Sequence, residues 1–182
     1  PDARDRGIVV HEILEQFVNT RPAQETRPEA RARLLAIARE VLARETPFPA
    51  ARALWLAKLD RAADHFLRED AKLGGATLAV ETKGELQVGA LPFTLFGTPD
   101  RIDRLPDGTL HLIDYKTGTP PSNEQQKHYA KQLLLAAAMA ERGGFADLGP
   151  SPVSRISYLG LGSNAKPEDT DLTPEMLDAD WA

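Results

Sequence analysis

Apolar residues recur every three to four positions through much of the first seventy residues, which is the spacing of an amphipathic helix. One helix is predicted over residues 6–20, and two more are predicted over 29–44 and 50–73. Prolines interrupt the apolar pattern between these helices, and a Gly-Gly pair follows the third helix. The chain up to about residue 73 is therefore expected to be helical, with the second and third helices as an insert before a sheet.

The pattern then changes to short apolar runs that are typical of strands. The first strand is predicted over residues 77–88. The stretches 97–103 and 112–118 are predicted to pair as antiparallel strands, because an Asp-Gly pair between them favours a hairpin turn. A helix is predicted over 124–142 and a last strand over 153–161. Since a helical crossover makes two strands parallel, we expect an α/β fold with a mixed central sheet flanked by helices.

A carboxylate and an ammonium group share one face at the end of the second hairpin strand. In an extended chain residues two apart point the same way, so Asp114 and Lys116 lie together and Tyr115 points to the other face. Removing both charges from water is costly without a partner or a function. A structural ion pair or a solvated strand end accounts for these residues as well as a catalytic pair does.

The preceding strand offers a second carboxylate. Asp100 and Asp103 are three positions apart and therefore face opposite sides of the sheet, so only one of them can point toward Asp114. Pro99 has no N–H to donate within a sheet, and we expect a bulge or a gap in pairing there. Spacing alone leaves open which of the two aspartates belongs with Asp114.

Together these stretches resemble the core of the PD-(D/E)XK phosphodiesterases, and in particular the RecB-type branch, which includes the AddB-like nuclease domains of bacterial double-strand-break repair. The resemblance runs from Gly7 to about Leu161 and implies a restriction-endonuclease-like core. It rests on four elements in family order: Gly7-x-x-x-His11-Glu12, Gly97-Thr98-Pro99-Asp100-Arg101-Ile102-Asp103, Asp114-Tyr115-Lys116-Thr117-Gly118 and Gln132-Leu133. The chain has Ala136 where the last family motif has a tyrosine.

The resemblance implies a divalent-metal site in which Asp100, and not Asp103, is used. Oxygen ligands suit Mg²⁺, and an added imidazole also allows Mn²⁺. Asp103 is then a structural or rim charge beside a neighbouring arginine. The implied ligands are His11, Asp100, Asp114 and the backbone carbonyl of Tyr115.

The resemblance also implies roles for the other site residues. Lys116 would orient the attacking water, help it lose its proton and stabilise the oxyanion. Glu81 and Gln132 would position water or the substrate backbone, and Tyr129 could replace the tyrosine missing at the last motif. The substrate-binding residues would be Gln132, Tyr129, Lys131 and Thr117.

Each assignment has an ordinary structural alternative. His11 could be a packed or surface histidine, Glu81 an edge carboxylate, and Gln132 the polar edge of an amphipathic helix. The arginines of the helix over 29–44 could contact a phosphate backbone, although a solvated helix face is the simpler interpretation.

Composition narrows the classes of function. The length of 182 residues suits a single domain, with a helical part to about residue 73, a catalytic core over 76–161 and an acidic tail over 165–182. The absence of cysteine excludes a disulfide, a thiolate zinc site and a cysteine-ligated iron–sulfur cluster. No apolar run is long enough to cross a membrane and no signal peptide or Walker-A loop is found, so we expect a cytoplasmic domain that binds no nucleotide cofactor.

The net charge of −5 argues against a free-standing DNA-binding protein, because neutralising phosphates drives most nucleic-acid affinity. A bound metal ion, or a basic channel on a partner or a neighbouring domain, would offset this charge. Because the sequence begins at Pro1 without a methionine, we expect a domain excised from a longer protein.

The expected function is that of a metal-dependent deoxyribonuclease. The resemblance implies an exonuclease that processes single-stranded ends in double-strand-break repair and recombination, with a helicase–nuclease partner subunit. Three alternatives stay open: a stand-alone RecB-type exonuclease, a catalytically silent nuclease fold that binds DNA or serves as a scaffold, and a structural domain with a fortuitous Asp-x-Lys pair.

Overall fold

The computed structural model describes residues 3–89, 92–118, 120–122, 124–125, 131–162 and 166–181. The chain divides into two compact units. The first comprises Pro1–Leu73, Tyr115–Pro120 and Leu159–Lys166, and the second comprises Gly74–Asp114, Pro121–Tyr158 and Pro167–Ala182.

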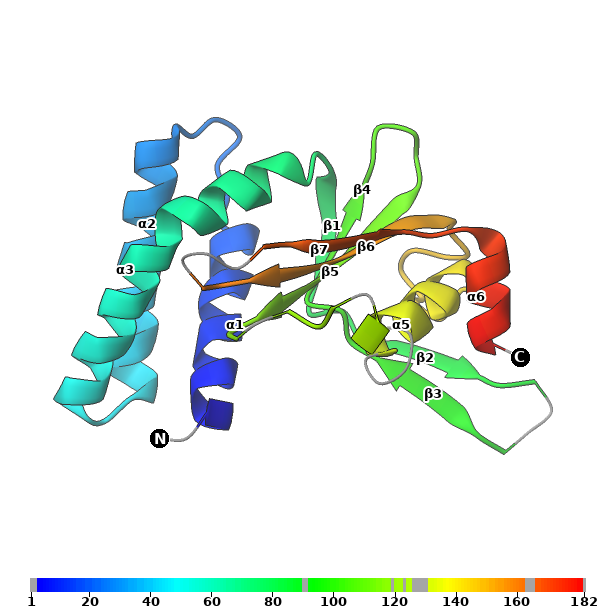
Figure 1. Ribbon diagram of the computed structural model, residues 1–182, viewed down its shortest axis with the longest axis horizontal. Helices are drawn as coiled ribbons and strands as arrows, with labels where there is room; N and C mark the ends of the chain where they lie inside the picture. The colour runs from blue at the N-terminus through cyan, green and yellow to red at the C-terminus, as the bar shows by residue number, and fades with distance from the viewer. Residues whose placement is uncertain are drawn as a thin grey trace. The chain divides into compact units, whose positions relative to one another are not determined.

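Three helices make up most of the first unit: α1 (Ala3–Asn19), α2 (Arg27–Glu45) and α3 (Pro49–Lys72), coloured blue to green in Figure 1. The predicted helices are confirmed, and their ends follow from local chemistry. Thr26 and Glu29 form a capping box at the start of α2, and Pro49 occupies the first turn of α3, where its missing N–H costs nothing. The apolar faces pack on one another through buried side chains that include Ile13, Leu14, Phe17, Leu34, Ala38, Val41 and Phe66.

Strand β5 (Leu110–Lys116) ends in the core of the first unit. Tyr115 is almost completely buried, and its ring packs edge-on against Phe66 with the ring centroids 5.9 Å apart. Phe66 packs in turn against Phe17 at 6.1 Å. One residue further on, the carbonyl of Lys116 accepts a hydrogen bond of 2.9 Å from the backbone N–H of Leu161. These contacts fix the backbone at the point where Lys116 leaves the strand.

The centre of the second unit is a five-stranded sheet with the strand order β1-β4-β5-β6-β7. Neighbouring strands are antiparallel between β1 and β4, between β4 and β5, and between β6 and β7. Strands β5 and β6 pair in parallel, since the start of one bonds to the start of the other (Leu110 N to Pro152 O, 2.8 Å) and their ends also bond. The other strands of the sheet are β1 (Ala76–Val80), β4 (Arg101–Arg104), β6 (Val153–Gly160) and β7 (Glu168–Asp171).

Helix α5 (Gln132–Glu141) lies between β5 and β6 in the chain and provides the crossover that makes these strands parallel. Its buried face joins the apolar face of the sheet in one core cluster, which includes Ile102, Leu110, Leu112, Leu133, Met139 and Ile156. The predicted α/β fold class with a mixed sheet flanked by helices is confirmed.

The predicted first strand is wrong in one respect, because residues 77–88 do not form one strand. Glu81 has a positive φ of 50°, a left-handed conformation that turns the chain out of β1. The residues after this turn form β2 (Gly84–Gln87), which pairs with β3 (Thr94–Gly97) in a separate two-stranded sheet.

The acidic segment over 165–182, which the sequence analysis treats as a tail, contains two regular elements. These are β7 at the edge of the large sheet and α6 (Pro174–Trp181), which contacts α5. Leu172 and Leu177 bury their side chains in the core cluster, so these two residues hold the segment to the second unit. In the described part of the chain, no helix has the length and apolar character needed to cross a membrane.

Candidate active site

Strand β5 carries the Asp-x-Lys pair at its C-terminal end. Asp114 and Lys116 lie on the same face of the strand, and Tyr115 points to the opposite face, where it meets Phe66. The carboxylate of Asp114 is buried, with 6% of the residue exposed, and Lys116 is half-buried. The alternation predicted from the sequence is therefore present.

Two strand registers bring further carboxylates to the same edge of the second unit. The β1–β4 and β4–β5 ladders end with pairs that both include Arg101. One residue further along, the same registers set Glu81 opposite Asp100 and Asp100 opposite Asp114. Directly opposed residues in antiparallel strands share a face, with Cα atoms about 4.5–5.5 Å apart. Glu81, Asp100 and Asp114 thus follow one another in backbone register across β1, β4 and β5, with Glu81 and Asp100 one residue outside their strands. We call these three residues the carboxylate row.

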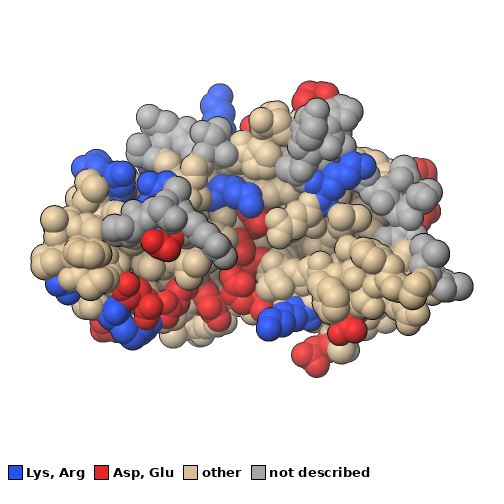
Figure 2. All heavy atoms as spheres, turned by 90° about the horizontal axis from the view of Figure 1, so that it is seen from below, with Lys and Arg blue, Asp and Glu red and all other residues tan. Residues whose placement is uncertain are grey.

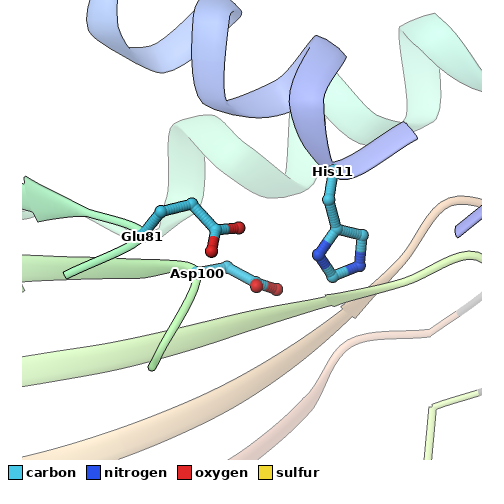
Figure 3. A group of neighbouring side chains, drawn as sticks. All are labelled: His11, Glu81 and Asp100. Atoms are coloured by element: carbon cyan, nitrogen blue, oxygen red, sulfur yellow. The ribbon is translucent and has the colours of Figure 1, made fainter. Parts of the chain in front are cut away.

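Glu81 and Asp100 lie close together in this row. The backbone N–H of Glu81 donates a hydrogen bond of 3.0 Å to the carbonyl of Asp100, and one carboxylate oxygen of each lies within 4.8 Å of the other. Figure 3 shows the two carboxylates side by side. Asp100 is 7% exposed, and Pro99 before it belongs to no strand, so the expected gap in pairing beside Asp100 is present.

The donor set of the carboxylate row fits a divalent metal ion. Neighbouring carboxylates repel one another, and burying them is costly unless a positive charge accompanies them. Carboxylate oxygens suit Mg²⁺ and Mn²⁺, and the chain has no cysteine that would favour a thiolate metal site.

His11 lies on α1 in the first unit and is drawn with the two carboxylates in Figure 3. Its side chain is half-buried, between the fully buried neighbours Val10 and Ile13. The residue therefore lies at the border of the buried face of α1. Its role as a metal ligand stays a prediction.

Asp103 has a structural partner. Its two carboxylate oxygens accept hydrogen bonds from Nε and Nη2 of Arg101, both at 2.6 Å, and both side chains are buried. The two residues are two apart on β4 and share a face, which is opposite to the face of Asp100. The expectation that Asp103 pairs with an arginine is confirmed, and Arg101 is that arginine.

A second buried polar group lies on the face of Asp103. Ser157 donates a hydrogen bond of 2.5 Å to Asp169, so the Nε2 atom of His111, 2.6 Å from the Ser157 hydroxyl, is the donor to it. The order is histidine, serine, carboxylate, and it differs from a hydrolase triad, in which the histidine stands in the middle. Burial lowers the pKa of His111 to about 4, and the Nδ1 atom has no hydrogen-bond partner in the described part of the chain. This group is structural.

Tyr158 is a site neighbour that the sequence analysis missed. It lies on β6, next to β5, is 2% exposed and forms a hydrogen bond with the backbone of Leu133. Burial, with a contribution from the charge of Asp114, raises the pKa of Tyr158 to about 12. A sequence does not reveal the register of a parallel strand pair, and this register is what sets Tyr158 beside Asp114.

The residues predicted to bind substrate are distributed as follows. Thr117 follows the end of β5 in the first unit, whereas Gln132 is the exposed first residue of α5 and Lys131 precedes it in the second unit. Tyr129 lies outside the described residues. Ala136 is buried in the core cluster, 3.7 Å from the position that a Cβ atom would take at Gly97, so a tyrosine at this position would need a different core.

Comparison with known proteins agrees with this geometry. Two relatives are described only as uncharacterized proteins, from Rickettsia bellii (strain RML369-C) and Rickettsia conorii (strain ATCC VR-613 / Malish 7). They are 26% identical over 151 residues and 25% identical over 154 residues, respectively, each covering 80% of this chain. The chain spans only 18% of the length of each relative.

A solved structure, described as the crystal structure of SSO0001, aligns with 97% of this chain and 86% of its own chain. The sequence identity is 17% and the TM-score is 0.37, a likeness too low to support an argument about function. The family comparison is decisive by contrast, because it covers almost the whole chain. The family model described as the PD-(D/E)XK nuclease superfamily matches residues 1–180, and the protein therefore belongs to this superfamily.

Proposed function

We propose that this chain is a metal-dependent nuclease domain that hydrolyses phosphodiester bonds in DNA. The observation that carries the proposal is the carboxylate row at the ends of β1, β4 and β5, together with Lys116 two residues beyond Asp114. Membership of a nuclease superfamily supports the same reaction class.

In the proposed mechanism some residues bind the metal ion and others orient the attacking water. Asp100, Asp114, the carbonyl of Tyr115 and His11 would hold Mg²⁺ or Mn²⁺. Such an ion supplies charge neutralisation at the reacting phosphate and lowers the pKa of water. The ammonium group of Lys116 orients the attacking water and stabilises charge that develops on the phosphate oxygens. Glu81 accepts a hydrogen bond from that water and sets its direction.

The biological role that we propose is exonuclease action on single-stranded DNA ends in double-strand-break repair, in the cytoplasm. The RecB-type motifs support this role. The net charge of −5 supports a helicase–nuclease partner that delivers the strand. Figure 2 agrees, because acidic and basic side chains are interspersed on the face that it shows, with no continuous basic surface among the coloured residues.

The test is cleavage of end-labelled single-stranded DNA by the purified chain with Mg²⁺, with Mn²⁺ or with EDTA. Cleavage should require the metal, and Lys116→Ala should lower the rate by at least about 100-fold while the thermal melt is unchanged. Lys72→Ala is the matched control, because Lys72 is an exposed lysine paired with Glu69 on α3. Full activity of the Lys116→Ala protein would contradict the mechanism.

A catalytically silent DNA-binding module is the second candidate. The alanine at 136 favours it, because this buried position holds no tyrosine that could contact a substrate. Calorimetry separates the two candidates: a chain that neither cuts DNA nor binds Mn²⁺ would be the silent form, whereas Mn²⁺ binding without cutting would indicate an intact site that needs its partner to deliver the strand.

A further inference from the structure

A pocket of about 290 Å³ lies within the first unit. Three cationic side chains line it: Arg6 from α1, and Lys58 and Arg61 from α3. Trp55 and Thr117 form other parts of its wall, and no aspartate or glutamate is among the described residues that line it. A pocket with this lining attracts an anion.

The three cations are free to bind a ligand. In the described part of the chain, none of them forms an ion pair or a hydrogen bond, and the Nε atom of Arg6 is enclosed without an acceptor. Lys58 and Arg61 are exposed at the pocket. A buried N–H without an acceptor costs free energy that an anionic ligand would recover.

Several other arginines of the same unit, by contrast, form ion pairs with acidic side chains. Most of the α2 arginines are already neutralised by acidic side chains. The pairs are Arg27 with Asp64, Arg31 with Asp60 and Asp64, Arg33 with Glu25, and Arg44 with Glu12 and Glu45. Among the described residues of α2, Arg39 has no such pair, whereas all three cations that line the pocket lack one.

The pocket is next to the end of β5. Thr117, in its wall, directly follows Lys116. The hydrogen bond between Leu161 and Lys116 joins this stretch to the residues just after β6, and Leu161 also lines the pocket. A phosphate bound here would lie in the same unit as Lys116, against a wall that includes the next residue in the chain, Thr117.

We propose that this pocket binds phosphate groups of the substrate strand next to the bond that is cut. The proposal rests on the proposed nuclease function and adds the residues that hold the strand: Arg6, Lys58 and Arg61. Phosphate contacts give affinity without reading sequence, so binding here should be independent of sequence and sensitive to salt.

The experiment measures binding of a fluorescent single-stranded oligodeoxynucleotide by anisotropy in EDTA, where no cleavage occurs, over a range of salt concentrations. The pocket variant carries Arg6→Gln, Lys58→Gln and Arg61→Gln. The control variant has the same net charge and carries Arg39→Gln, Arg52→Gln and Arg68→Gln, at positions that do not line the pocket. The slope of log K against log[salt] should fall by about 2 in the pocket variant, since each lost contact contributes about 0.7 for a single strand.

Binding by the pocket variant should also be about tenfold weaker at low salt, while the control variant should bind as the wild type does. Equal losses in the two variants would overturn the proposal, because they would indicate a general effect of net charge. Failure of the nuclease proposal looks different: the pocket would still govern binding, but no metal would produce cleavage.

Discussion

One buried histidine and one buried tyrosine have pKa values far from their usual range, and burial is the main cause. His111 lies in the sheet with a pKa of about 4, and Tyr158 lies beside Asp114 with a pKa of about 12. Both shifts favour the neutral form. At neutral pH, therefore, Tyr158 is a hydrogen-bond donor next to the carboxylate row and not a charge.

The pKa of His111 leads to a prediction about acid stability. The unfolded chain takes up the proton near pH 6.5, whereas the folded chain does not until about pH 4. The stabilisation by neutral His111 is thus complete above pH 6.5 and is lost as the pH falls toward 4. From about pH 6.5 to 5 the free energy of unfolding should drop by about 1.5 kcal/mol from this residue.

Urea titrations at several pH values measure this loss. In His111→Gln, which can still bond to Ser157, the decline over the same pH interval should be smaller by that amount. An unchanged decline in the variant would show that other groups are responsible.

At the scale of elements, β4 is held by the buried pair of Arg101 and Asp103. Asp103→Ala would leave the Arg101 guanidinium buried without its partner, and we expect a loss of about 3–5 kcal/mol in the free energy of unfolding. Asp60→Ala, which removes an exposed partner of Arg31, should cost less than about 1 kcal/mol. Chemical denaturation compares the two, and similar losses would contradict the structural role of the buried pair.

Close packing at the start of β1 gives a second prediction. A Cβ atom at Gly75 would lie 2.6 Å from the Cβ of Asp103, too close for two carbon atoms. Gly75→Ala should therefore destabilise the second unit by about 1–3 kcal/mol. Gly118→Ala is the control, because nothing lies within 4 Å of its added Cβ. A Gly75→Ala protein with the melting temperature of the wild type would refute this packing argument.

Helices and strands differed in how far the sequence could predict them. The helices of the first unit have long, regular apolar stripes, and their pattern was sufficient. The break at Glu81 depends on one left-handed residue, which an apolar pattern does not reveal. Strand β7 and helix α6 are not predicted from the sequence because, among their described neighbours, Leu172 and Leu177 are the buried apolar residues of an otherwise polar segment.

The candidate site was partly predictable for a similar reason. Alternation along one strand predicts the common face of Asp114 and Lys116. The approach of Glu81 to Asp100 needs the β1–β4 register, and the position of Tyr158 needs the β5–β6 register; neither can be read from a single sequence.

At the scale of the whole molecule, the proposed metal ligands, His11 and the carboxylate row, come from distant parts of the sequence. An ion bound by them should stabilise the folded chain. At a Mn²⁺ concentration of 100 times Kd the expected gain is about 2.7 kcal/mol.

For His11→Ala, each tenfold rise in Kd should remove about 1.4 kcal/mol of that gain, and thermal melts with and without Mn²⁺ measure it. His65→Ala on α3 is the matched histidine control. A gain in the His11→Ala protein equal to that of the wild type would exclude His11 as a ligand.

Strand β5 passes from the second unit to the first between Asp114 and Tyr115. The Cα atoms of the two residues on either side of this boundary are separated by two residues of extended backbone, about 6.6 Å. Covalent bonds fix this backbone spacing, whereas the flexible stem of Lys116 sets where its ammonium group lies. For the proposed nuclease, we expect control to act on access to the site, through the arrival of a strand and the presence of an ion. An inhibitor that blocks entry of the strand should therefore be effective.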